Sequence, residues 1–457
     1  MQTNRNFSVS APGPDGILQE LRFDDYLPEG DEREDIKSSA HEALKKMIEK
    51  PTDYRGHVEK ARQFLRVLWK KYDCENVVEI FDAFTRVEPV LIDMEESEGV
   101  GFRYRDHSVH TFHVFTFGLR VISKLINTVG DEQAQELLKI KPEKICRFIP
   151  AFRDYDYKER LLYLWSLMST FHDIAVPLEH LDIIRDGLNQ FSRQFDLTIE
   201  GPYLQDIMAA DIEEYFSLLS RIFQGGVKFV DEGVCYKQDE ENLYVKNILA
   251  REFKKKNHGV LGGFMMYNII KKTFLLGLSK HKLDMNSFNN YVKFVLSQDV
   301  ARAALAISLH NLKRDPSTNE GPLFLPLSFD KYPLTFILIL SDGLQEYLRW
   351  EGTTIRGATM ISRFPAVELK VNSSIVELEV TYYLGEDSFQ KKIFMKQAES
   401  RAKLLSTSPP QNIGDAASIL CNALTEELRK QINLRDNFVL YLNIKQNGKD
   451  LIRRRVQ

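Results

Sequence analysis

Through most of the first 350 residues, apolar side chains recur every three to four positions, which is the spacing of helices that bury one face. In the stretch 57–72, for example, Val58, Ala61, Leu65 and Leu68 fall on one face. This pattern predicts a mainly α chain. The predicted helices are 35–50, 57–72, 108–129, 160–174, 206–223, 245–276, 287–312 and 334–350.

After residue 357 the period of the pattern changes to two. Val367, Leu369 and Val371 alternate with charged residues, and the stretches 376–382 and 438–444 also alternate. Such a period is typical of half-buried strands. Together with a helix predicted at 416–432, the strands indicate a small C-terminal α+β domain.

The chain is long enough for several domains, because 457 residues exceed the roughly 100–200 residues of a typical one. Its first 16 residues are rich in Ser, Asn, Pro and Gly and offer almost nothing to bury. We expect a disordered tail at 1–20, flanking helices at 21–90, a large helical domain at 91–358 and the α+β domain at 359–457.

Charge and composition narrow the classes of partner. A net charge of −4 gives no general attraction to nucleic acid or to anionic lipid, so any phosphate recognition must be local. The longest strongly apolar stretch, 334–340, is far shorter than the roughly 20 residues of a membrane span. The first residues lack the pattern of a secretory signal, so a cytoplasmic protein is expected, and self-association into a homo-oligomer is left open.

The four cysteines do not form a recognisable site. Cys74, Cys146, Cys235 and Cys421 stand far apart without a C-x-x-C pair. Their spacing disfavours a zinc knuckle, a redox dithiol and a disulfide scaffold. Buried reduced thiols are expected.

Three histidines share one side of a predicted helix. His107, His110 and His113 are spaced by three, so a metal or a phosphate could meet that side. The alternative is a helix whose histidines are simply hydrogen-bonded or partly exposed. These residues are therefore candidates and do not define a site alone.

The pair His172 and Asp173 is a stronger signal. It ends the run 161–171, which is apolar apart from two serines and a threonine. A charge in such a place is costly unless it is paired or bound to a metal. A structural His–Asp hydrogen bond is the alternative interpretation.

The order of these residues resembles a known signature. His110-Thr111-x-x-Val114, then His172-Asp173, then Asp342 is similar to the His…His-Asp…Asp pattern of the HD superfamily of metal-dependent phosphohydrolases. Two further histidines, His258 and His310, lie between the pair and the last Asp, as in the two-metal members. The resemblance covers about residues 100–350. It implies an HD-type helical bundle within 91–358 and six metal ligands, namely His110, His172, Asp173, His258, His310 and Asp342.

The resemblance does not extend to two named branches. His258 and Gly262 match the His-x-x-x-Gly element of the HD-GYP phosphodiesterases, but Asn311 and Val176 replace that family's second His and its Lys, and the Gly-Tyr-Pro motif is missing. Specific hydrolysis of cyclic-di-GMP is therefore not expected. In the dNTP triphosphohydrolases the His-Asp pair is followed by Gly-His-Gly-Pro, whereas residues 174–177 here read Ile-Ala-Val-Pro and His180 is off register.

Imidazole and carboxylate ligands without cysteine suit an open site for Fe, Mn, Co, Ni or Zn. The sequence hypothesis is that Asp173 bridges two divalent metals and that a bridging hydroxide attacks a phosphate ester, such as a nucleotide or a cyclic nucleotide. Arg105, His107 and His113 are candidates for substrate binding. Further cations near proposed ligands, more often solvated than functional, are Lys254, Lys255, Lys256, Lys313 and Arg314.

Two other functions fit the same order of residues. One is a di-iron oxygenase, because a branch of HD proteins resembling inositol oxygenase uses the same six-ligand order. The other is a non-catalytic nucleotide sensor, in which the α+β domain transmits the bound state to a partner. The substrate and the metal are not specified by these residues.

Overall fold

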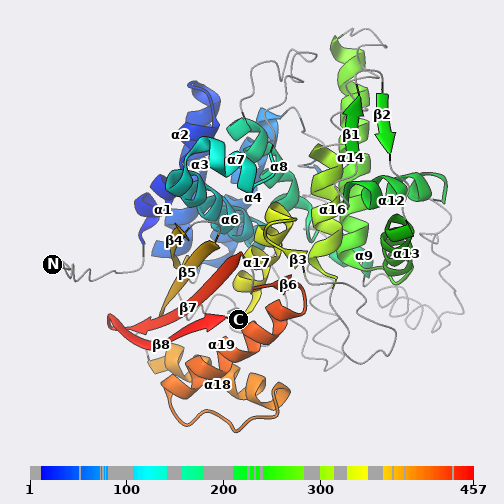
Figure 1. Cartoon of the computed structure of the whole chain (residues 1–457). Helices are drawn as coiled ribbons and strands as arrows, with labels where there is room; N and C mark the ends of the chain where they lie inside the picture. The colour runs from blue at the N-terminus through cyan, green and yellow to red at the C-terminus, as the bar shows by residue number, and fades with distance from the viewer. Residues whose placement is uncertain are drawn as a thin grey trace, which may run out of the picture. The chain divides into compact units, whose positions relative to one another are not determined.

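The structure of the chain is a computed structural model (Figure 1). Within its described part the chain is mainly helical, with a small sheet near the C-terminus, as predicted. None of the described helices combines the length and the apolar content needed to cross a bilayer. The described residues are 12–50, 53–72, 74, 77, 79–80, 107–140, 157–179, 209–223, 227–230, 233–236, 240–281, 299–312, 327–347, 364–372, 375–384, 388–434 and 437–456.

The chain divides into two compact units. Unit 1 comprises residues 1–68, 102–141 and 325–457, and unit 2 comprises residues 69–101 and 142–324. Each unit combines segments that are distant in sequence. The domain bounds predicted from the sequence stay a prediction.

The helical part of unit 1 is built around α6, whose residues are buried along most of its length. From α6, the Arg120 Nε donates to Glu20 Oε2 on α1 at 2.5 Å. Phe64 on α4 packs against the rings of Phe112 and Phe115. The helices are α1 (Pro14–Leu21), α2 (Phe23–Tyr26), α3 (Asp31–Glu49), α4 (Tyr54–Lys71, ending in unit 2), α6 (His107–Val129) and α7 (Asp131–Leu137).

Helix α1 differs from the disordered tail predicted for residues 1–20. The helix begins at Pro14, and proline suits the first helical position because its missing N–H has no intrahelical partner there. Ile17 and Leu21 are buried one turn apart. These two side chains anchor the end of the segment whose polar composition suggested a tail.

The sheet of unit 1 has the order β4-β5-β7-β8 (Figure 1). The β5–β7 pair is parallel and the other two pairs are antiparallel. The described part of the crossover between β5 and β7 contains two helices, and one of them, α19, also contacts α17. The elements are α17 (Pro333–Tyr347), β4 (Ala366–Asn372), β5 (Ile375–Leu384), α18 (Ser388–Leu404), α19 (Ile413–Arg429), β7 (Phe438–Gln446) and β8 (Lys449–Val456), with a short parallel pair β3 (Leu327–Ser328) and β6 (Ile432–Asn433).

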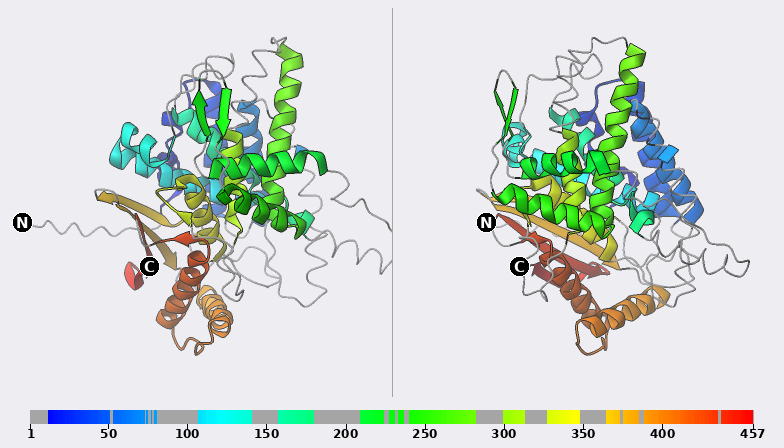
Figure 2. Two further views of the ribbon diagram at one scale, coloured as in Figure 1. Left: turned by 45° about the vertical axis from the view of Figure 1, so that its right-hand side comes forward. Right: turned by 90° about the vertical axis from the view of Figure 1, so that its right-hand side faces the viewer.

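The described part of unit 2 is helical apart from one antiparallel pair of short strands, and its helices α12, α13, α14 and α16 pack together (Figure 2). An aromatic cluster of Tyr215, Phe216, Phe253 and Phe264 joins three of these helices. The elements are α8 (Tyr157–Phe171), α9 (Val176–Glu179), α12 (Ala209–Phe223), β1 (Val227–Val230), β2 (Gly233–Tyr236), α13 (Glu240–Lys254), α14 (His258–His281) and α16 (Ala301–His310).

The single helix predicted at 245–276 is wrong, because the chain breaks between α13 and α14. Lys256 adopts a positive φ of 59°, which ends the first helix. The side-chain oxygen of Asn257 then accepts hydrogen bonds from the N–H groups of Gly259 (3.0 Å) and Val260 (3.3 Å). This cap starts a new helix at His258.

Candidate metal centre

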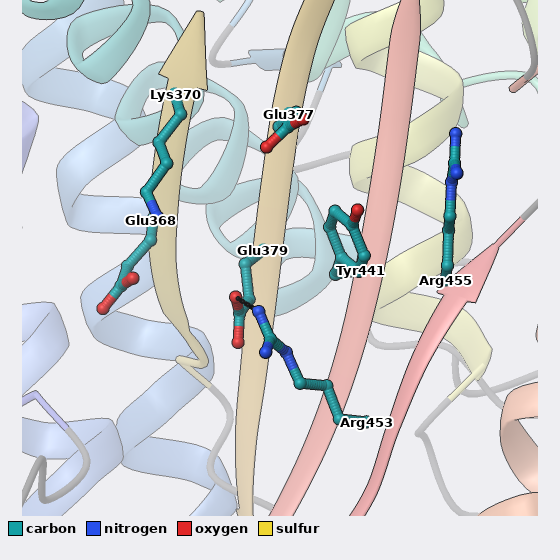
Figure 3. A pocket seen from close by; sticks show the side chains of 7 residues that line it. All are labelled: Glu368, Lys370, Glu377, Glu379, Tyr441, Arg453 and Arg455. Carbon is teal, nitrogen blue, oxygen red and sulfur yellow. Dashed lines mark hydrogen bonds and ion pairs between the residues drawn. The ribbon is translucent and has the colours of Figure 1, made fainter.

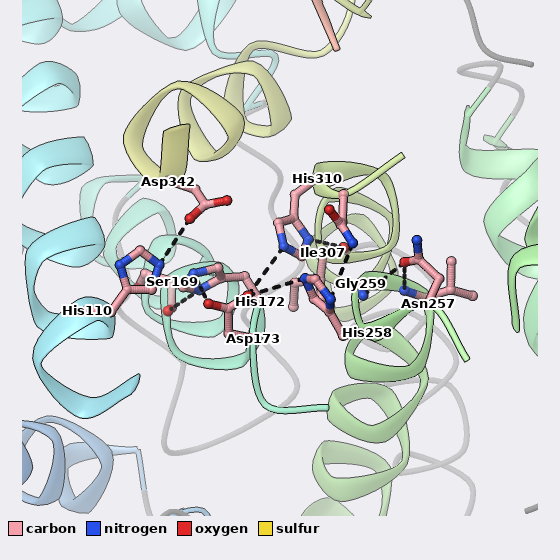
Figure 4. A network of polar contacts seen from close by, with 12 residues as sticks. His110, Ser169, His172, Asp173, Asn257, His258, Gly259, Ile307, His310 and Asp342 are labelled. Carbon is pink, nitrogen blue, oxygen red and sulfur yellow. Dashed lines mark hydrogen bonds and ion pairs between the residues drawn. The ribbon is translucent and has the colours of Figure 1, made fainter. Parts of the chain in front are cut away.

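Asp173 is the centre of a buried polar cluster in unit 2 (Figure 4). It lies in the turn after α8 and is only 2% exposed. Its Oδ1 lies 3.4 Å from His258 Nε2 and 3.7 Å from His310 Nε2, whereas its Oδ2 lies 3.4 Å from His172 Nε2. The ligand atoms of Asp173, His258 and His310 all lie within 4.8 Å of one another. The cluster could therefore hold a metal ion.

The backbone fixes the proton position in two of these imidazoles. His172 Nδ1 lies 2.9 Å from the carbonyl oxygen of Ser169, and His310 Nδ1 lies 2.6 Å from that of Ile307. A ring nitrogen that faces a carbonyl oxygen must carry the hydrogen, so Nδ1–H is the donor in both rings. In the neutral imidazole, Nε2 then presents a lone pair.

These lone pairs face the carboxylate of Asp173. Two acceptors that face each other in a buried place repel unless a cation lies between them. A metal ion satisfies both acceptors, whereas protonating both rings would bury two positive charges beside one carboxylate. The donor set therefore fits a metal better than a purely structural His–Asp hydrogen bond.

His258 is oriented by the side chain of Asn311, the residue that stands where HD-GYP proteins carry a second His. The amide nitrogen of Asn311 lies 3.2 Å from His258 Nδ1, and in this orientation of the amide Nδ1 accepts the hydrogen bond. A half-turn of the same amide would place its oxygen next to Nδ1. The ring proton would then sit on Nδ1, and the lone pair of Nε2 would face Asp173. Asn311 thus controls which atom of His258 can bind a metal.

Glycines in the segment Asn257-His258-Gly259 and beyond allow the close approach of α14 to its neighbours. A Cβ built on Gly259 would lie 2.8 Å from the carbonyl oxygen of Ile307, and one built on Gly262 would lie 2.9 Å from that of Phe171. Both distances are shorter than a real Cβ contact. Only glycine lets α14 pack this close to α16 and to the end of α8, where His310 and His172 lie.

We expect Gly263→Ala to destabilise unit 2 and to lower its metal content. The added Cβ would lie 2.5 Å from the backbone oxygen of Ala304, so α14 must move away from α16. Overpacking of this kind costs about 1–3 kcal/mol of unfolding free energy. Urea denaturation followed by circular dichroism, with metal analysis of the same samples, measures both effects.

Gly16→Ala in α1 is the matched control. A Cβ at Gly16 would meet its nearest neighbour, the Cβ of Pro12, at an ordinary 3.9 Å. Alanine is the better helix former by roughly 0.5–1 kcal/mol, so this variant should equal or exceed the parent in stability. A Gly263→Ala chain as stable as Gly16→Ala would contradict the close packing described for α14.

Two of the six predicted ligands pair within unit 1. His110 Nε2 on α6 lies 3.0 Å from Asp342 Oδ1 on α17, with His110 buried and the Asp342 side chain 15% exposed (Figure 4). The other four, His172, Asp173, His258 and His310, lie together in unit 2. That all six form one ligand set stays a prediction.

The predicted substrate-binding residues lie in varied surroundings. His107 and His113 are buried on α6, and the His113 ring stacks on Phe364 with centroids 4.6 Å apart. Lys254 and Lys255 are exposed, and Lys255 donates to Glu252 at 3.0 Å. Outside the described residues lie Arg105, His180, Lys313 and Arg314.

Comparisons with protein-family models, with curated proteins and with solved structures found no match for this chain. Its function is therefore argued from its own residues. The residues that the sequence analysis did not assign to the site are Ser169, Asn257 and Ile307, with Asn311 noted only as a substitution. Asn257 and Asn311 each neighbour a predicted ligand in sequence, which is the signal that could have found them.

Proposed function

We propose that this chain is a metal-dependent phosphohydrolase of the HD kind. The observation that supports it best is the Asp173 carboxylate placed between imidazoles whose Nε2 atoms face it. Within unit 2, the metal ligands would be Asp173, His172, His258 and His310. His110 and Asp342 join the proposed set because of their order in the sequence, which resembles that of two-metal HD proteins.

The two oxygens of Asp173 support a bridging role for this residue. Oδ1 faces His258 and His310, whereas Oδ2 faces His172, so each oxygen has its own imidazole neighbours. A carboxylate divided in this way suits two ions better than one. The proposed number of metals is therefore two, and their identity among Fe, Mn, Co, Ni and Zn is left to measurement.

The charge of the proposed ligand set favours an anionic substrate. Four neutral histidines and two aspartates carry a total charge of −2. Two divalent ions would add +4, so the loaded site would carry a net charge of +2. Bound divalent metals lower the pKa of coordinated water from 15.7 to about 7 and stabilise charge on phosphoryl oxygens. A phosphate ester is therefore the proposed substrate class, with nucleotides and cyclic nucleotides as the first candidates.

The residues of the chain itself would hold and orient these components. The Ser169 and Ile307 carbonyls keep protons on the Nδ1 atoms of His172 and His310, so that Nε2 stays available. Burial of Asp173 excludes competing water from its oxygens. Arg105, His107 and His113 are the proposed contacts to substrate, with proton donation to the leaving group assigned to one of the two histidines.

The test is a turnover assay on the full chain with Mn or Fe added. A panel of nucleoside phosphates and cyclic nucleotides is followed by phosphate release and by chromatography of the products, beside a measurement of oxygen consumption. We expect the parent chain to cleave a phosphate ester. A chelator should stop this cleavage, and so should the substitution His310→Gln. The control His41→Gln should keep it, because His41 pairs with Asp15 on the surface. Oxygen uptake without ester cleavage would indicate the oxygenase, and thermal stabilisation by a nucleotide without product would indicate the sensor.

A further inference from the structure

One face of the C-terminal sheet is polar and hollowed (Figure 3). The hollow has a volume of about 390 Å³, and the side chains that line it come from all four strands. Four of these residues are exposed and the others are half-buried. They are Glu368 and Lys370 on β4, Glu377 and Glu379 on β5, Tyr441 on β7, and Arg453 and Arg455 on β8.

The charges on this face are balanced but unevenly placed. Its two carboxylates on β5 and its two guanidinium groups on β8 flank the ring of Tyr441, while β4 contributes one charge of each sign. A polyanion such as nucleic acid would meet repulsion over β5, and a cationic partner would meet it over β8. The face therefore fits a partner with the opposite division of charge.

The register of the strands makes one row of this face complementary to itself. Glu379 pairs with Tyr441, and Tyr441 pairs with Arg455, so the three residues form a straight row across β5, β7 and β8. A two-fold axis along β7 would place the same row of a second copy in reverse order. Glu379 would then face Arg455 of the other copy, and the two Tyr441 rings would meet.

Of the two arginines on β8, Arg453 already has partners within its own copy, so Arg455 is the one that can pair with the second copy. Arg453 donates to Glu379 at 2.8 Å and lies over the Tyr441 ring at 5.6 Å. Arg455 is exposed, and its side chain makes no ion pair or hydrogen bond among the residues that the structure describes. Glu368 stands directly opposite Glu379, and such like charges repel, so a second guanidinium would stabilise them.

We propose that the chain forms a two-fold dimer through this face, with the row Glu379, Tyr441 and Arg455 at its centre. Three strands about 4.8 Å apart, each contributing some seven residues of about 3.4 Å rise, give roughly 300 Å² on each copy. That area is below the roughly 800 Å² per partner of a stable interface. The dimer is therefore weak and reversible, and it forms only at raised chain concentration.

Sedimentation velocity of the full chain over rising concentration tests this proposal. We expect the parent chain to shift toward the dimer and Arg455→Glu to raise the dissociation constant at least about tenfold. The Arg455→Glu/Glu379→Arg double variant should recover association, because it reverses both partners of the contact. Lys449→Glu, which makes the same charge change on the exposed end of β8, is the control and should dimerise like the parent.

Circular dichroism verifies that each variant is folded before it is compared. A parent chain that stays monomeric at the highest concentration would overturn the proposal. Equal association of Arg455→Glu and Lys449→Glu would overturn it as well. The readout is the oligomeric state, so it is independent of the proposed phosphohydrolase activity.

Discussion

Asp173→Ala is expected to release all bound metal and to abolish turnover while the helical fold persists. In the proposed site this carboxylate serves both ions, because its two oxygens face different imidazoles. Its loss therefore removes a ligand from each ion at once. Metal analysis by mass spectrometry, with circular dichroism of the same sample, measures the two parts of this expectation.

Asp330→Ala is the control for this substitution, since Asp330 is an exposed residue of the turn before α17. It should keep the metal content and the activity of the parent chain. If Asp173→Ala retained two metals per chain, the bridging role of Asp173 would be wrong. If it retained one metal, Asp173 would be a ligand of a single ion.

The second large effect is expected at the ion pair between Arg160 and Asp299 in unit 2. Arg160 Nε and Nη2 donate to the two oxygens of Asp299, each at 2.6 Å, and the side chains are only 12% and 11% exposed. The pair joins the first turn of α8 to the residues before α16. Asp299→Asn keeps the shape but removes the negative charge that faces the largely buried guanidinium of Arg160, and breaking a buried ion pair in this way costs about 3–5 kcal/mol of unfolding free energy.

Urea denaturation of the full chain measures this loss as a lower midpoint. The control is Glu213→Gln, which removes the partner of Lys246 from an ion pair of 2.8 Å whose Glu213 side chain is 79% exposed. Solvent already screens that pair, so its removal should leave the midpoint close to that of the parent chain. Equal midpoints for the two variants would show that burial of the Arg160–Asp299 pair adds nothing.

Hydrophobic periodicity predicted the helices that bury one face, but it could not detect a break made by capping. The apolar patterns of α13 and α14 are separated only by the polar run 254–259, and the cap within this run depends on the conformation of Lys256 and on the side chain of Asn257. The pattern also missed α18, whose apolar residues do not gather on one face, and β8, whose three arginines hide its alternation. In both elements the surrounding structure decides the conformation.

The sequence predicted which residues form the cluster in unit 2, but it did not predict which nitrogen of each histidine carries the proton. The apolar run before His172 and Asp173 indicated a buried pair, and the structure places His258 and His310 beside it. The protonated nitrogens of His172 and His310 depend on carbonyls three residues earlier at the helix ends. Such contacts follow from backbone geometry, which the spacing of residue types does not encode.

The most direct test of the proposed site is the anomalous scattering of crystals of the full chain grown with Mn²⁺. We predict one peak beside Asp173 Oδ1, His258 and His310, and a second peak beside Asp173 Oδ2 and His172. Absence of any peak next to Asp173, with His258 or His310 directed to solvent, would contradict the account.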